Sequence, residues 1–151
     1  MPSQKERYAI GMAGEHFVVA ELLRRGVAAS VTLGNAKRAD VVVLNRDVTK
    51  VVVVEVKSSP RKEWVVGNNI PHATNQPWVF VHIPADGASP RYFVLTAQEL
   101  NALLSPGDAA FRKRFLEKHS KPFTGKGVVK LKLKEAEGYE NKWSSIINQI
   151  S

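Results

Sequence analysis

Three acidic residues, Glu15, Asp40 and Glu55, stand in segments whose neighbours predict burial. Glu15 belongs to a helix predicted over Lys5–Arg25 and ended by Gly26. On the helical wheel it falls in the middle of the stripe predicted to be buried, which includes Tyr8, Gly11, Met12, Val18, Val19 and Leu22. A lone ionised carboxylate inside a core is costly unless a proton, a cation or a basic side chain compensates for its charge. These positions therefore predict either a functional site or carboxylates that reach solvent or pair with lysine or arginine.

Asp40 and Glu55 fall in two predicted strands, 39–44 and 50–57, which a short polar turn joins into a hairpin. A turn centred midway makes the two carboxylates direct cross-strand neighbours, with Cβ atoms about 5 Å apart. Two such carboxylates repel each other unless a proton or cation lies between them, and Lys57 shares the face of Glu55. The assumed register gives the pairs Leu44–Val51, Val43–Val52, Val42–Val53, Val41–Val54 and Asp40–Glu55. The apolar residues around Glu55 predict a strand covered on both faces.

Hard oxygen ligands of this kind suit Mg²⁺, which takes one or two carboxylates and keeps several waters. The ion would polarise a phosphoryl group and activate water, while Lys57 could orient or deprotonate the attacking water or stabilise developing charge. Glu15 could hold the ion directly or through water. Without metal, Lys57 would be the counterion of the acids. The four residues Glu15, Asp40, Glu55 and Lys57 thus predict hydrolysis of a phosphodiester, and the alternative is a purely structural ion-pair network.

The remaining pattern predicts one α/β domain with a mixed sheet over residues 1–151, with a core over about 5–104 and a basic C-terminal extension over about 105–151. The segment 60–76 is rich in Pro, Gly and Asn and is predicted to be irregular. The other predicted strands are Val27–Leu33, Trp78–Ile83, Tyr92–Leu95 and an edge strand Gly127–Leu133, and the other predicted helices are Ala97–Leu104, Asp108–His119 and Tyr139–Ile150, the last docked by Trp143, Ile146 and Ile147.

Composition narrows the function classes. The 151 residues include no cysteine, which excludes a disulfide framework, a thiol nucleophile and cysteine-based metal sites. The polar N-terminus and the short apolar stretches predict no secretory signal and no membrane span, so a cytoplasmic setting is expected. Nine basic residues and one acid lie between Arg112 and Lys134, which accounts for the formal charge of +8. This segment is either a nucleic-acid-binding face or a solvated surface.

The combination of Gly11-x-x-Gly14-Glu15, Arg38-Ala39-Asp40 and Glu55-Val56-Lys57 resembles the PD-(D/E)XK nuclease superfamily. The resemblance implies a restriction-endonuclease-like fold, with a central mixed β-sheet flanked by helices, an N-terminal helix and extra C-terminal helices. It also implies Mg²⁺-dependent cleavage of DNA, with Mn²⁺ able to substitute. Asp40, Glu55 and the Val56 carbonyl would be metal ligands, and Lys57 the base or water-positioning group. Glu15 matches the helical acid of the small Holliday-junction-resolvase-like branch, and a homodimer is expected.

The leading interpretation is a DNA endonuclease, either structure-specific or junction-resolving, acting in repair, recombination or defence. The alternative is a catalytically inactive nucleic-acid-binding module with the same fold. The pattern itself is compatible with DNA or RNA. The predicted contacts to nucleic acid are Lys37, Arg38, Ser58, Arg61, Lys62, Arg112, Arg114 and Lys118.

Overall fold

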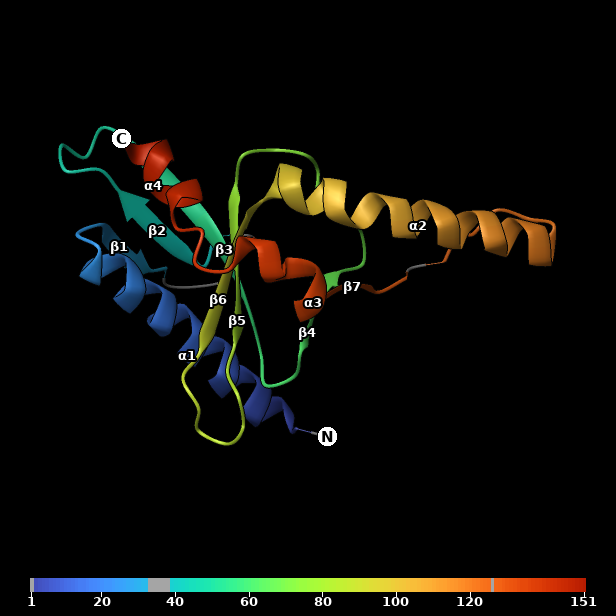
Figure 1. Ribbon diagram of the computed structural model, residues 1–151, viewed down its shortest axis with the longest axis horizontal. Helices are drawn as coiled ribbons and strands as arrows, with labels where there is room; N and C mark the ends of the chain where they lie inside the picture. Colours follow the sequence, from blue (N-terminus) through green and yellow to red (C-terminus); the bar gives the residue numbers. More distant parts are fainter. Residues whose placement is uncertain (1, 33–38, 126) are drawn as a thin grey trace.

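The computed structural model describes residues 2–32, 39–125 and 127–151. Its centre is a five-stranded sheet, shown in Figure 1, in which the strands are ordered β1-β2-β3-β5-β6. Only β3 and β5 are parallel, so the predicted α/β architecture with a central mixed sheet is confirmed. The strands are β1 (Ala28–Val31), β2 (Val41–Leu44), β3 (Val51–Ser59), β5 (Pro77–His82) and β6 (Arg91–Thr96).

The predicted hairpin register is confirmed between β2 and β3, from Leu44 opposite Val51 to Val41 opposite Val54. The turn closes where the Val48 amide donates to the Asn45 carbonyl at 3.1 Å. Val48 takes a left-handed φ of 55° there. The ladder ends at the Val41–Val54 pair, and beyond it the Asp40 amide donates to the Val54 carbonyl at 3.0 Å. The predicted Asp40–Glu55 pair is therefore not part of the ladder, because the register shifts by one residue at Asp40.

Two hydrophobic layers cover the sheet. On one face, helix α1 (Gln4–Arg24) and helix α4 (Ser144–Ile150) pack against alternate residues of β2 and β3. On the other face, helix α2 (Ala97–His119), the short helix α3 (Leu133–Ala136) and a small two-stranded sheet cover β5 and β6. We call these the α1-side core, which includes Val18, Leu22, Val41, Val43, Val54, Val56, Trp143 and Ile146, and the α2-side core, which includes Trp64, Trp78, Phe80, Phe93, Leu100 and Leu131.

The small sheet corrects the prediction that residues 60–76 are irregular. Within them β4 (Glu63–Gly67) pairs antiparallel with β7 (Val129–Lys132), which lies far along the chain. Trp64 anchors β4 because its indole is buried in the α2-side core and donates a hydrogen bond to the Val81 carbonyl at 2.9 Å. The predicted edge strand over 127–133 is therefore real but shorter, and it pairs with β4.

The prediction of two helices over 97–104 and 108–119 is wrong, because α2 is continuous through Pro106. Proline removes one backbone hydrogen bond to the residue four positions earlier. Here that residue is Ala102, and both Ala102 and Pro106 are exposed, so the lost bond is open to water. The second half of α2 consequently extends away from the sheets (Figure 1).

Two other predictions change. The face of β3 that carries Val51 and Val53 is uncovered, with exposed fractions of 60% and 40%, so β3 is not covered on both faces along its length. The helix predicted over 139–150 is the shorter α4, preceded by a 3₁₀ turn over Glu137–Tyr139, although Trp143 and Ile146 are buried as predicted. No helix of the described residues has the length and apolarity needed to cross a membrane.

Helix α1 lies very close to β3 at Gly14. A Cβ atom on Gly14 would stand 1.7 Å from Oγ and 2.8 Å from Cβ of Ser58. The buried stripe of α1 consists of Gly14, Val18 and Leu22. Glu15 is therefore on the flank of the stripe, not at its centre as the helical wheel suggested, and Tyr8 is 72% exposed.

Replacing Gly14 with alanine is expected to destabilise the protein by about 2 kcal/mol, because α1 must move away from β3. Gly11→Ala is the matched control, since nothing lies within 4 Å of a Cβ there. That change is expected to be neutral or stabilising, because alanine favours a helix by up to about 1 kcal/mol over glycine. Urea unfolding of both variants measures the difference, and equal stabilities would contradict the close approach.

Candidate functional site

Asp40 ends the ladder between β2 and β3. Its amide donates to the Val54 carbonyl at 3.0 Å, one residue out of register with the ladder, in which Val54 faces Val41. Its carboxylate then accepts a hydrogen bond from the Val56 amide at 2.9 Å, in the position that a further strand carbonyl would take. Asp40 is thereby fixed at the edge of β3, where the sheet stops being paired with β2.

Glu15 reaches this carboxylate from α1. Partial burial raises the pKa of Glu15 to about 7, and the charge of Asp40 and a hydrogen bond with it add to this effect. Two carboxyl groups can share a hydrogen bond only if one of them carries a proton. The Glu15–Asp40 pair therefore holds a proton up to about neutral pH.

Glu55 and Lys57 form a second pair on the opposite face of β3. The Lys57 Nζ lies 3.4 Å from Oε1 of Glu55, whose residue is only 7% exposed. The ammonium is also 6.0 Å from the centre of the Trp78 ring. A third of the Lys57 side chain remains exposed, so its ammonium is held by Glu55 and still accessible to a ligand.

The four predicted site residues thus form two pairs at one edge of β3. Glu15 approaches Asp40 from the α1 side, and Glu55 holds Lys57 on the other side. In the part of the chain that the structure describes, no three acidic or histidine side chains form a group that could hold a metal ion. The three carboxylates are therefore not gathered into a single cluster.

The predicted nucleic-acid contacts differ in their placement. Ser58 turns its hydroxyl under α1, where the oxygen is buried. Arg112 is engaged internally, because it pairs with Asp108 at 3.0 Å, donates to the Phe123 carbonyl and lies over the Phe123 ring. Lys37 and Arg38 lie outside the described residues. Besides Arg112, the exposed members are Arg61 and Lys62 in the turn after β3, and Arg114 and Lys118 on the protruding half of α2.

A cavity of about 350 Å³ adjoins Lys57. Its walls are the first turns of α1, the end of β3, strand β4 and one residue of β7, and they include Arg7, Arg61 and Lys130. Arg7 and Lys130 are not among the site residues predicted from the sequence. Arg7 is seven residues before Gly14, hence about 20° away on the same side of α1, which is a usable signal. Lys130 could be placed only with knowledge of the β4–β7 pairing.

One solved structure, described as a bacterial homing endonuclease, I-Ssp6803I, matches this arrangement. It superposes with a TM-score of 0.57 over 97% of this chain and 95% of that chain, at 17% sequence identity. The chain therefore shares its overall fold with that homing endonuclease. No family model and no curated protein matches its sequence. The similarity to the homing endonuclease concerns the fold, and the identity is too low to transfer individual residues.

The raised pKa of Glu15 predicts how the stability of the protein depends on pH. Because the pKa is raised from 4.5 to about 7, the folded state binds a proton more tightly than the unfolded chain between these values. The contribution of Glu15 to stability is therefore present at low pH and is lost as pH rises toward and past 7.

Urea unfolding from pH 4.5 to 8 should show wild type losing stability relative to Glu15→Gln as pH rises, so that the variant is the more stable protein above pH 7. Carbon-13 NMR titration gives the direct measurement. Asp40→Asn should lower the pKa of Glu15, because it removes a neighbouring negative charge. A Glu15 carboxyl that titrates near 4.5 in wild type would contradict the proposed proton sharing.

Proposed function

We propose that this chain is a Mg²⁺-dependent DNA endonuclease of the PD-(D/E)XK type, which hydrolyses phosphodiester bonds. The observation that carries the proposal is the edge of β3, where Asp40 is fixed by the Val56 amide beside the Glu55–Lys57 pair. The fold shared with a homing endonuclease supports nuclease activity in general, whereas the proposed reaction is argued from these residues.

The donor set fits Mg²⁺. Asp40 and Glu55 offer carboxylate oxygens from adjoining strands, and the Val56 carbonyl would complete the protein ligands, with Glu15 holding the ion directly or through water. A Mg²⁺ site needs only one or two carboxylates, because the ion retains several waters, so a three-acid cluster is not required. The proton between Glu15 and Asp40 also marks a concentration of negative charge that a cation could neutralise. Bound there, Mg²⁺ would supply a Lewis acid for the phosphoryl group.

Three other side chains have distinct roles in the proposed reaction. Lys57 is accessible and positively charged beside the edge of β3, so it can position the attacking water and stabilise charge that develops on the phosphate. Glu55 holds the Lys57 ammonium in place at 3.4 Å. Glu15 orients Asp40 and takes up or releases the proton that the two carboxylates share.

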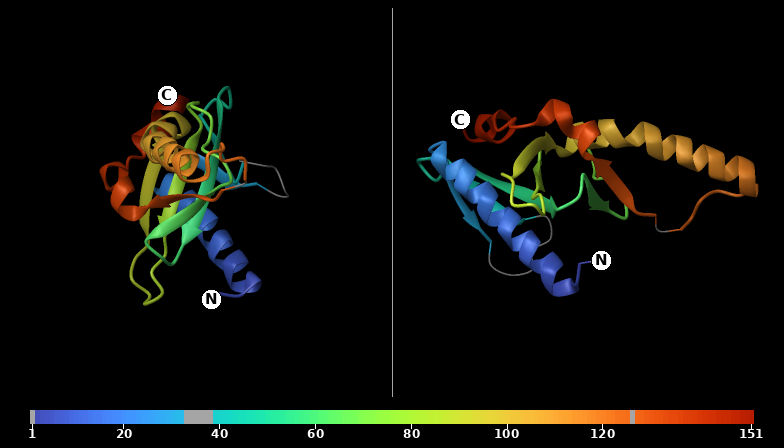
Figure 2. Two further views of the ribbon diagram at one scale, coloured as in Figure 1. Left: turned by 90° about the vertical axis from the view of Figure 1, so that its right-hand side faces the viewer. Right: turned by 60° about the horizontal axis from the view of Figure 1, so that its bottom comes forward.

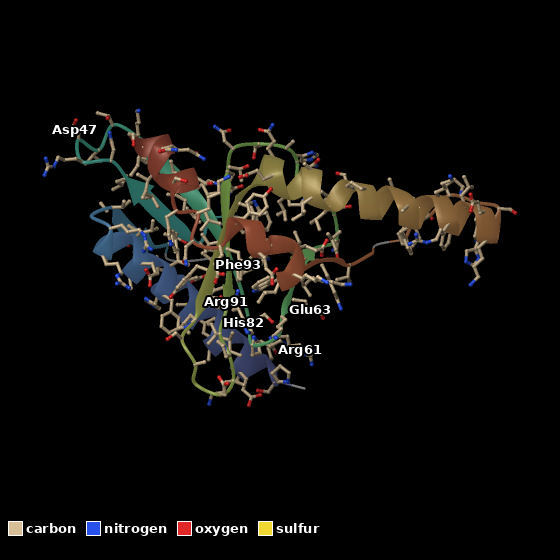
Figure 3. All side chains as sticks on the ribbon, viewed as in Figure 1. Asp47, Arg61, Glu63, His82, Arg91 and Phe93 are labelled. Atoms are coloured by element: carbon tan, nitrogen blue, oxygen red, sulfur yellow. The ribbon has the colours of Figure 1, made fainter. Side chains whose placement is uncertain are left out.

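Basic side chains provide for DNA binding at two places. Arg61 and Lys62 lie in the turn that follows the catalytic strand, and Figure 3 shows Arg61 at the tip of this turn. Arg114 and Lys118 lie on the exposed half of α2, which projects from the body in the right-hand view of Figure 2. Contacts from these groups to phosphates would set the register of the duplex or junction.

The second candidate function is a non-catalytic nucleic-acid-binding module with the same fold. It is favoured by the division of the acids into two pairs and by the basic surface of α2. This module would bind DNA with a steep salt dependence and without a divalent ion.

Cleavage of supercoiled plasmid and of a four-way junction with Mg²⁺ or Mn²⁺ tests the enzyme. Asp40→Asn and Lys57→Ala should each lower the rate by about a hundredfold or more, because they remove a metal ligand and the group that positions water. Arg46→Ala, in the exposed hairpin turn, is the control and should cleave like wild type. Equal cleavage by all the proteins would exclude the proposed site.

Calorimetric titration with Mn²⁺ separates the two candidates. Wild type should bind the ion, with an affinity that rises between pH 6 and pH 8 because Glu15 must give up its proton. Asp40→Asn should lose binding, whereas Lys57→Ala should keep it. If wild type shows no heat of Mn²⁺ binding, or if Asp40→Asn binds Mn²⁺ as wild type does, the non-catalytic module is favoured.

A further inference from the structure

The cavity beside Lys57 is lined by two arginines from different elements. Arg7 comes from α1, and Arg61 comes from the turn between β3 and β4. Figure 3 shows Arg61 and Glu63 near the N-terminal end of α1, although their segments are distant in the sequence. The cavity opens on the same edge of β3 that carries the proposed catalytic lysine.

The charges in this cavity are unbalanced. Four cationic side chains line it, Arg7, Lys57, Arg61 and Lys130, against the single carboxylate of Glu63. Lys57 is paired with Glu55 at 3.4 Å, and Lys130 is paired with Glu63 at 3.5 Å. Within the residues that the structure describes, neither Arg7 nor Arg61 has an ion pair. The Arg7 guanidinium donates to the Pro2 carbonyl at 3.4 Å, which leaves most of its donors available.

Two uncompensated guanidinium groups that face one cavity repel each other unless an anion lies between them. A guanidinium presents paired N–H donors whose spacing matches two phosphate oxygens, and it remains charged at any physiological pH. A cavity of about 350 Å³ that is open to solvent admits the phosphate and sugar of one nucleotide, whereas the side chains of Trp64 and Ile10 in its wall offer no acceptor for a cation.

We infer that Arg7 and Arg61 clamp a backbone phosphate that is not itself cleaved, next to the phosphate at Lys57. The position of this clamp relative to the cleaved bond rests on the proposed function, whereas the recognition of phosphate rests on the cavity alone. The ligand is an internal phosphodiester of a bound strand. A terminal phosphate offers the same chemistry and is distinguished below.

Fluorescence anisotropy with a labelled oligonucleotide duplex, in buffer without divalent ions, measures the clamp. Arg7→Ala and Arg61→Ala should each weaken binding about tenfold, the loss expected for one charge-assisted hydrogen-bonding group. Each should also lower the slope of log affinity against log salt by about one. Arg46→Ala removes the same charge far from the cavity and should change neither quantity. Thermal melting checks that all variants are folded.

Single methylphosphonate substitutions locate the phosphate. One neutral linkage should weaken the binding of wild type and leave the Arg7→Ala/Arg61→Ala double variant unaffected. If the affinity of wild type depends instead on whether the oligonucleotide carries a 5′ phosphate, the clamp binds a strand end, and the proposed internal site is overturned. Equal affinities of wild type and the double variant, or no binding by wild type, overturn the clamp whether or not the protein cleaves DNA. If the variants show that the clamp binds phosphate but no divalent metal supports cleavage, the proposed nuclease function is overturned and the clamp is retained.

Discussion

The close approach of α1 to β3 is the constraint on which the site depends. Only a hydrogen atom fits between Gly14 and Ser58, so the helix can lie near enough for the next residue, Glu15, to meet Asp40. Asp40 is itself fixed by the Val56 amide at the end of the paired part of β3. A helix held farther out by a larger side chain would leave this carboxylate pair apart, and the proton between them would have no common site.

Around this contact, charges of opposite sign are arranged in layers. The two carboxylate positions at the edge of β3 are compensated from within, by a shared proton on one face and by Lys57 on the other. Cationic side chains of α1, the β3–β4 turn and β7 lie just outside. Such an arrangement suits a pair of ligands of opposite charge, a small cation at the acids and a polyanion along the outer groups, because each reduces the electrostatic cost of binding the other.

The sequence predicts the parts of this site that depend on local patterns. Consecutive valines around a short polar turn predict the register of β2 and β3 from Val41–Val54 to Leu44–Val51, and strand alternation predicts that Lys57 shares the face of Glu55. The shift at Asp40, whose amide bonds to the Val54 carbonyl, has no signal in the sequence. The sequence does not predict β4, because the partner of that strand lies after α2 and no local signal connects them. For the same reason the cavity and the role of Lys130 could not be foreseen. The predicted position of Glu15 at the centre of the buried stripe is wrong because Tyr8 was counted as part of that stripe, whereas its side chain is exposed.

The α1-side core joins segments from both ends of the described chain. Trp143 and Ile146 complete the layer that also holds Val18, Val41 and Val54. Contacts between segments so distant in sequence slow folding, since the intervening chain must be ordered before they form. A nascent or truncated polypeptide that lacks α4 would therefore leave the layer that supports β3 incomplete.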